Sequence, residues 1–139
     1  MPDDTNISLP EGVGVSLVNG DSTVRHARQL LLRSERYDVR SYASCAALLA
    51  DPASRDNPCI ILDLEMQECD GVDILAKMRA SGWRGKALLF GSLDPGSVLL
   101  YEAERHGDRV MQPNVGDLTL LIAIDASVDR SWAGWNAVA

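Results

Sequence analysis

The chain lacks the long apolar run of a membrane helix, and its first residues lack the basic and apolar regions of a secretory signal peptide. These absences predict a cytoplasmic protein that does not enter a membrane. Clustered lysine and arginine are missing too, and the 139 residues carry a formal net charge of −7. Because nucleic acids and anionic lipids attract clustered positive charge, we expect neither as a partner and favour another protein.

Cysteine is scarce, and Cys45, Cys59 and Cys69 form no C-x-x-C pair and have no histidine nearby. This spacing argues against a disulfide framework or a zinc site, so we expect reduced thiols. Gly12-x-Gly14 precedes the first expected strand and so cannot hold a phosphate at the start of a helix. No serine, histidine and acid arrangement stands out either. The sequence therefore indicates a protein that is not an enzyme.

Length and composition fit one globular domain, with 46% hydrophobic and 24% charged residues. Residues 1–12 are polar and contain two prolines, which predicts a flexible N-terminal lead-in. We expect the domain itself over residues 13–128. Residues 129–139 are expected to extend the last helix or to form a tail.

Short apolar runs alternate with helical patterns along the whole domain. We expect strands at residues 13–18, 39–42, 60–63, 87–90 and 109–111, and a surface loop at residues 53–58. Helices are expected around residues 24–32, 45–49, 72–78 and 98–105 and from residue 115 onward. Strands alternating with helices predict right-handed crossovers and a parallel sheet covered on both faces. The predicted fold is a flavodoxin-like (βα)5 three-layer sandwich.

The first and last helices show apolar stripes. In the first, Val24, Ala27, Leu30 and Leu31 recur at helical spacing, with Leu32 as a further candidate, and the other faces carry Arg25, Arg28, Arg33 and Glu35. In the last, we expect a buried stripe of Leu118, Leu121, Ile124 and Val128. Steps of three, four, four and three residues continue this stripe from Leu121 through Ile124 and Val128 to Trp132 and Trp135. We expect one helix over residues 118–135. Its exposed end could bind a partner, including a second copy of the chain, or fold back onto its own domain.

The apolar run at residues 60–62 ends in Asp63. Such a run is typical of a strand buried on both faces, and it places Asp63 at the carboxyl end of that strand. Open α/β sheets carry their binding sites at this edge. Capping of the following turn is the alternative role for this aspartate.

Several short stretches together carry a family resemblance. They are Leu17-Val18, residues 37–44 (YDVRSYAS), residues 61–66 (ILDLEM), Gly71 and Pro113. In their order and spacing, residues 13–128 resemble the receiver domain of two-component response regulators, especially those related to nitrogen-fixation regulators. The resemblance implies the strand order 2-1-3-4-5. It also implies transfer of a phosphoryl group from a kinase histidine to Asp63, assisted by Mg²⁺.

The supporting positions of this expected site depart from the family pattern. Two acidic residues that would hold Mg²⁺ after the first strand are replaced by Asn19 and Gly20. A shifted alignment would instead make Asp21 the second acid. The hydroxyl residue after the fourth strand is replaced by Gly91, although Ser92 follows it.

Two further positions complete the expected site. The lysine before Pro113 is replaced by Gln112, an amide without charge. Glu65 either supplies a replacement carboxylate or is a solvated loop residue. With Asp63 and Glu65 as the remaining metal ligands, we expect no cofactor or weakly bound Mg²⁺.

These features predict a stand-alone receiver-like signalling protein that acts by protein–protein interaction. The favoured hypothesis is a pseudo-receiver without ordinary Mg²⁺-dependent phosphorylation. The alternative is a working response regulator, phosphorylated on Asp63 by a histidine kinase or a phosphotransfer protein. The expected partner is a histidine kinase or another signalling protein, and the last helix could also support a homodimer.

Overall fold

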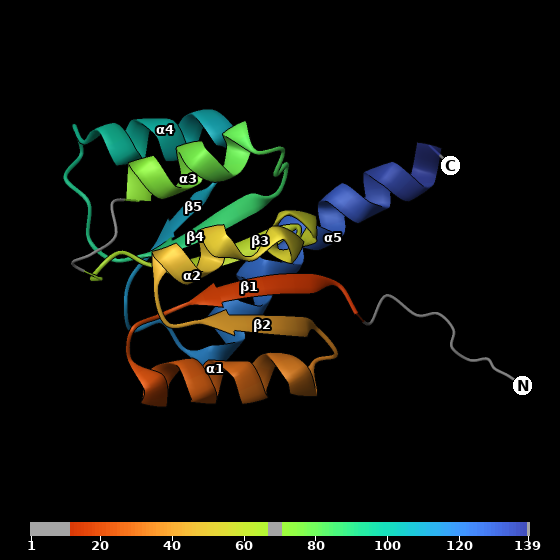
Figure 1. Ribbon diagram of the computed structural model, residues 1–139. Helices are drawn as coiled ribbons and strands as arrows, with labels where there is room; N and C mark the ends of the chain where they lie inside the picture. Colours follow the sequence, from red (N-terminus) through yellow and green to blue (C-terminus); the bar gives the residue numbers. More distant parts are fainter. Residues whose placement is uncertain (1–11, 67–70, 139) are drawn as a thin grey trace, which may run out of the picture.

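The computed structural model describes the backbone of residues 12–66 and 71–138, and the side chains of these residues except 72 and 129–138. Strands and helices alternate along this part of the chain (Figure 1). The strands are β1 (Gly14–Val18), β2 (Asp38–Tyr42), β3 (Cys59–Asp63), β4 (Lys86–Phe90) and β5 (Arg109–Met111). The helices are α1 (Ser22–Ser34), α2 (Cys45–Ala50), the 3-10 helix η2 (Pro52–Asp56), α3 (Gly71–Ala80), α4 (Val98–His106) and α5 (Asp117–Val138).

The strands form one parallel sheet in the order β2-β1-β3-β4-β5, which confirms the predicted flavodoxin-like topology. β3 lies at its centre, and the strand is fully buried from Cys59 to Leu62. The register pairs Val18 with Leu62 and Asp63 with Phe90. Since all strands run in one direction, their carboxyl ends meet at a single edge of the sheet.

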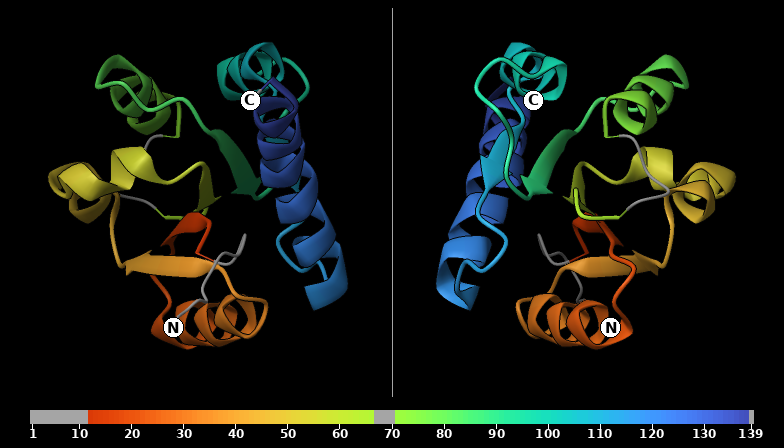
Figure 2. Two further views of the ribbon diagram at one scale, coloured as in Figure 1. Left: turned by 90° about the vertical axis from the view of Figure 1, so that its right-hand side faces the viewer. Right: turned by 90° about the vertical axis from the view of Figure 1, so that its left-hand side faces the viewer.

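Helices cover both faces of the sheet, and Figure 2 shows α2 and α3 on one side and α5 on the other. The side chains of α2, α3 and α4 pack on Ile60, Leu62 and Leu89. Those of α1 and α5 pack on Ile61 and Phe90. Neighbouring residues of β3 therefore belong to opposite cores, as the two-residue period of a strand requires.

The predicted surface loop at residues 53–58 is wrong. Residues 52–56 form η2, and the side chains of Ser54 and Asn57 are buried. Asn57 Nδ2 donates to Ser16 Oγ at 2.9 Å, and Trp83 Nε1 donates to the Asn57 carbonyl at 2.7 Å. A side chain at Gly14 would collide with the Asn57 amide, so this position requires glycine. The segment is an anchored connection because its polar groups are satisfied inside the fold.

The predicted apolar stripe of α1 is wrong at Ala27 and Leu30, while Val24, Leu31 and Leu32 lie inward. Ala27 is exposed and Leu30 is 55% exposed, whereas Leu32 is buried. The inward positions include a half-buried Arg28, so the prediction that this arginine lies on a solvent-facing side is wrong. Val24, Arg28 and residues 31–32 still follow helical spacing, which shows that an arginine occupies a core-facing position.

The cysteines differ from the expectation of reduced thiols. Cys59 is free and buried, but Cys45 is disulfide-bonded, so the expectation is wrong for Cys45. Cys69 lies outside the described residues. Among the described helices, none has the length and apolar character needed to cross a bilayer.

α5 runs unbroken from Asp117 to Val138, which confirms one helix over residues 118–135. The predicted buried stripe is wrong at Leu118, which is 71% exposed in the first turn, whereas Ile124 and Val128 are buried. The side chains of Trp132 and Trp135 lie outside the described ones. Their role at an interface or in a fold-back therefore stays a prediction. The lead-in at residues 1–12 also stays a prediction, because the structure describes the chain from residue 12.

Candidate functional site

Asp63 lies at the carboxyl end of β3, as predicted, with a half-buried side chain. Its Oδ1 accepts a hydrogen bond from the Glu65 backbone N–H at 2.9 Å. One carboxylate oxygen therefore caps the turn after the strand, which is the alternative role considered above. The same carboxylate stands at the edge where the strand ends converge.

The side-chain amide of Asn19, in the loop after β1, is already hydrogen-bonded within its own turn. Asn19 is 4% exposed, and its Oδ1 accepts from the Asp21 backbone N–H at 2.8 Å. The Asn19 carbonyl accepts from Arg25 Nη1 at 2.7 Å, and its N–H donates to the Tyr42 carbonyl at 3.1 Å. These bonds fix the turn into α1. The Asn19 side-chain oxygen thus serves the fold at the place where the family pattern has a metal carboxylate.

The neighbouring positions do not replace that carboxylate. Gly20 is exposed, and a Cβ built on it would lie 3.8 Å or more from its neighbours, so a side chain has room there. Asp21 is the N-cap of α1, with its carboxylate accepting from the backbone N–H groups of Thr23 and Val24. The shifted alignment would therefore need an acid that already caps a helix.

Gly91 follows β4 at the same edge, and the space beside it is filled. A Cβ on Gly91 would lie 2.9 Å from Leu64 Cβ and 3.4 Å from Glu65 Oε2. Backbone bonds hold both partners in place, because Leu64 N–H donates to the Phe90 carbonyl at 2.9 Å and Gly91 N–H donates to the Met111 carbonyl at 3.0 Å. The turn after Asp63 thus occupies the volume that a hydroxyl side chain would need.

The Leu64 side chain connects this turn to α4. It is half-buried and packs against the core under α2, α3 and α4. A Cβ built on Gly71 would lie 3.1 Å from Leu64 Cδ2 and 3.0 Å from Leu99 Cδ2. Leu64 is therefore packed among the start of α3, the start of α4 and Gly91.

The remaining predicted positions lie at the same sheet edge. Ser92 and Gln112 are exposed and come directly after the ends of β4 and β5, beside Gly91 and Met111 respectively. Glu65 is also exposed, and its carboxylate reaches over Gly91. The predicted positions thus lie at the same edge of the sheet as Asp63, where Gly91 and Gln112 lack the hydroxyl and ammonium groups of the family pattern.

A residue near the predicted site that the sequence interpretation did not place there is Arg28. Its guanidinium carbon lies 4.6 Å from the centroid of the Phe90 ring, and Phe90 is the cross-strand neighbour of Asp63. Burial lowers the pKa of Arg28 below its ordinary value, and the charges of Asp63 and Asp117 oppose this shift. The sequence signal was the helical spacing of Arg28 with Val24 and residues 31–32.

The donors at this edge do not fit a three-carboxylate magnesium centre. Asn19 uses its amide oxygen in a turn, Gly20 has no side chain, and Asp63 is the carboxylate that remains. Within residues 12–66 and 71–128, no three histidine, cysteine, aspartate or glutamate side chains gather closely enough to hold a metal ion. No step of a mechanism is therefore assigned to a metal here.

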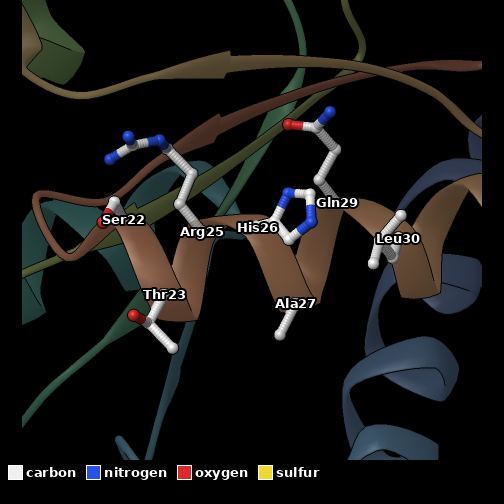
Figure 3. Close-up of a pocket in the computed structure, with 7 residues that line it drawn as sticks. All are labelled: Ser22, Thr23, Arg25, His26, Ala27, Gln29 and Leu30. Carbon is white, nitrogen blue, oxygen red and sulfur yellow. The ribbon is translucent and has the colours of Figure 1, made fainter.

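A shallow hollow of about 680 Å³ lies along α1. Figure 3 shows Arg25 and Gln29 projecting toward the sheet, while Thr23 and Ala27 point away from it. Gln29 hydrogen-bonds Ser41 of β2. The hollow is lined by one helix alone, namely by Ser22, Thr23, Arg25, His26, Ala27, Gln29 and Leu30. It contains none of the residues expected to carry function.

A parallel α/β sandwich with an aspartate at the carboxyl end of its central strand defines a receiver-like domain. The family description "response regulator receiver domain" matches residues 15–93. This match covers more than half of the chain, and the chain belongs to the response regulator receiver family.

The similar proteins agree with this assignment. The transcriptional regulatory protein FixJ of Azorhizobium caulinodans is 29% identical over 126 residues, which cover 88% of this chain and 58% of FixJ. A CheY-like receiver domain from Methanospirillum hungatei JF-1 superposes with a TM-score of 0.78 at 17% identity, covering 88% of this chain and 98% of that one. A response regulator receiver from Bermanella marisrubri has a TM-score of 0.72 at 20% identity, with 84% and 98% covered. The similarity to these two solved structures is evidence for the fold alone.

Proposed function

We propose that this chain is a cytoplasmic pseudo-receiver, a two-component signalling domain that acts by binding other proteins without ordinary Mg²⁺-dependent phosphorylation. One observation carries the proposal. Leu64 Cβ and Glu65 Oε2 lie 2.9 and 3.4 Å from the position of a Cβ on Gly91. The volume next to the acceptor is thus occupied where a phosphoryl-contacting side chain would be needed.

The chemistry of phosphoryl transfer adds support. The transferred group spreads negative charge over three oxygens, and catalysis depends on cations and hydrogen-bond donors placed around it. Here Asn19 is bonded within its own turn, and Gln112 offers a neutral amide. Asp63 and Glu65 can hold Mg²⁺ weakly at best, because hard cations of this kind prefer several oxygen ligands in a strict geometry.

The exposed apolar side chains favour protein partners. Val98 and Tyr101 on α4 are each 64% exposed, and Leu118 and Ile122 on α5 are 71% and 60% exposed. Exposed apolar side chains grouped on a helix are typical of protein contacts. We propose a histidine kinase or another signalling protein as the partner, with a second copy of the chain, joined through α5, as a further partner. The domain works through these contacts and not through turnover of a small molecule.

The deciding experiment is the intact mass of the protein after incubation with acetyl phosphate and Mg²⁺. We expect no increase corresponding to a phosphoryl group in the natural chain. Asp63→Asn is the matched control, because it removes the acceptor oxygen and keeps the size of the side chain. An adduct that appears in the natural chain and disappears in Asp63→Asn would refute the pseudo-receiver and support the alternative, a working regulator phosphorylated on Asp63.

A further inference from the structure

The inward side of α1 carries a positive charge at a core-facing position. Arg28 lies in the stripe that includes Val24 and Leu32, and its guanidinium carbon stands 4.6 Å from the centre of the buried Phe90 ring. Removing a guanidinium from water is unfavourable unless charges or aromatic faces compensate. The Phe90 ring supplies one of these compensations.

The charges of two carboxylates, those of Asp63 and Asp117, supply the other compensation for the buried guanidinium. Asp63 is paired with Phe90 across the strands, and neighbouring strands lie about 4.8 Å apart. Ile61 packs in the core under α1 and α5, so the two-residue period directs Asp63 toward the same face. Asp117 is the first residue of α5, and the charges of both aspartates act on the Arg28 guanidinium.

A second arginine of α1 reaches the same edge of the sheet. Arg25, three residues before Arg28, donates from Nη1 to the Asn19 carbonyl at 2.7 Å. Positions three residues apart lie on one side of a helix, so α1 directs both cations toward the strand ends. Positive charge is thus built into the fold at the same end of the sheet as Asp63.

We infer that Arg28 is an internal counter-cation of Asp63, and that its positive charge offsets the negative charge of this carboxylate without a metal and opposes the entry of a divalent cation. Arg28 is a positioning residue that acts through Asp63. The inference rests on the proposed function, because a pocket that works without Mg²⁺ needs another positive charge near its aspartate. Like charges repel strongly at the short distances of a partly buried site, so a fixed guanidinium and Mg²⁺ compete for the same carboxylate.

The test is Mg²⁺ titration of the full chain by calorimetry or by NMR chemical shifts. Arg28→Met removes the charge and leaves an apolar side chain that suits a core-facing position, and we expect it to bind Mg²⁺ at least about fivefold more tightly. Arg33→Met is the matched control, because it makes the same change of net charge at an exposed position of the same helix. We expect the control to stay within about twofold of the natural chain, since exposed charges are screened by salt. Arg28→Lys, which keeps the charge, should bind as weakly as the natural chain.

A purely structural role for Arg28 would weaken folding without tightening Mg²⁺ binding. A folded Arg28→Met protein with unchanged or weaker Mg²⁺ binding would overturn the inference. Arg28→Gln, judged by the same criterion, replaces it if the methionine variant does not fold. Saturable micromolar binding by the natural chain would instead refute the proposed function, whatever the variants do.

Discussion

Replacing Gly91 by threonine tests whether the fold can still accommodate a hydroxyl side chain at this position. The new Cβ would lie 2.9 Å from Leu64 Cβ, well inside the usual carbon–carbon separation of about 3.5–4.0 Å. The Leu64 backbone N–H is hydrogen-bonded to the Phe90 carbonyl. Relief of the clash therefore requires movement of the Leu64 main chain as well as of its side chain. Overpacking of this kind costs about 1–3 kcal/mol. For a domain of this length, the expected fall in melting temperature is about 4–12 °C.

The assay is thermal and urea unfolding of Gly91→Thr beside Gly96→Thr. Gly96 lies in the same connection between β4 and α4, and a Cβ built on it meets nothing within 4 Å. We expect the control to unfold like the natural chain. Leu64→Gly should reduce the penalty of Gly91→Thr, because it removes the Cβ that collides together with the rest of the side chain. Equal unfolding midpoints for the two glycine variants would refute the packing argument.

The same crowding governs any attempt to restore a response to beryllium fluoride, which mimics a phosphoryl group. Gly20→Asp has room for its side chain, since a Cβ there stays 3.8 Å or more from its neighbours. We expect Gly20→Asp, Gly91→Thr and Gln112→Lys together to respond weakly, and to respond more strongly once Leu64→Gly is added. NMR shift changes on adding the mimic measure this. A full response without the Leu64 change would contradict the explanation.

Three further predictions concern the rest of the fold. Arg79→Met should lower the free energy of unfolding by about 3–5 kcal/mol, because it leaves the fully buried Asp108 carboxylate without the cation that bonds it at 2.8 Å; a change under about 1 kcal/mol in urea melts would count against it. Burial and the hydrogen bond to Asp51 raise the pKa of Tyr42 to about 12, so stability should be lost as pH rises from about 10 through 12, when the unfolded chain releases this proton first. Urea midpoints across this range should fall less for Tyr42→Phe than for the natural chain, and parallel curves would contradict the assignment. Burial raises the pKa of the Cys59 thiol to about 12, so iodoacetamide should label it after unfolding and not before, as peptide mass mapping can show.

The fold follows from features that are local in the sequence. An apolar run at residues 60–62 ending in Asp63, flanked by alternating strand and helix patterns, is enough to predict a parallel sheet and the edge that carries the site. The substitutions at Gly20 and Gly91 are visible in the same way, because an absent side chain cannot be supplied by folding. Spacing and residue type therefore predicted the parallel sheet, while the resemblance to receiver domains implied the strand order and showed the departures from the family pattern.

Tertiary packing decided what surrounds Asp63. Periodicity assigned Arg28 to a polar face, but the structure places it on the Phe90 ring, because an aromatic face and two nearby carboxylates compensate the cost of burying its charge. Likewise, the sequence shows that Gly91 lacks a side chain, while the structure shows Leu64 filling that space. Both contacts join residues that lie far apart in the sequence. Their chemistry depends on distances that arise only when the sheet has assembled, so no local pattern could predict them.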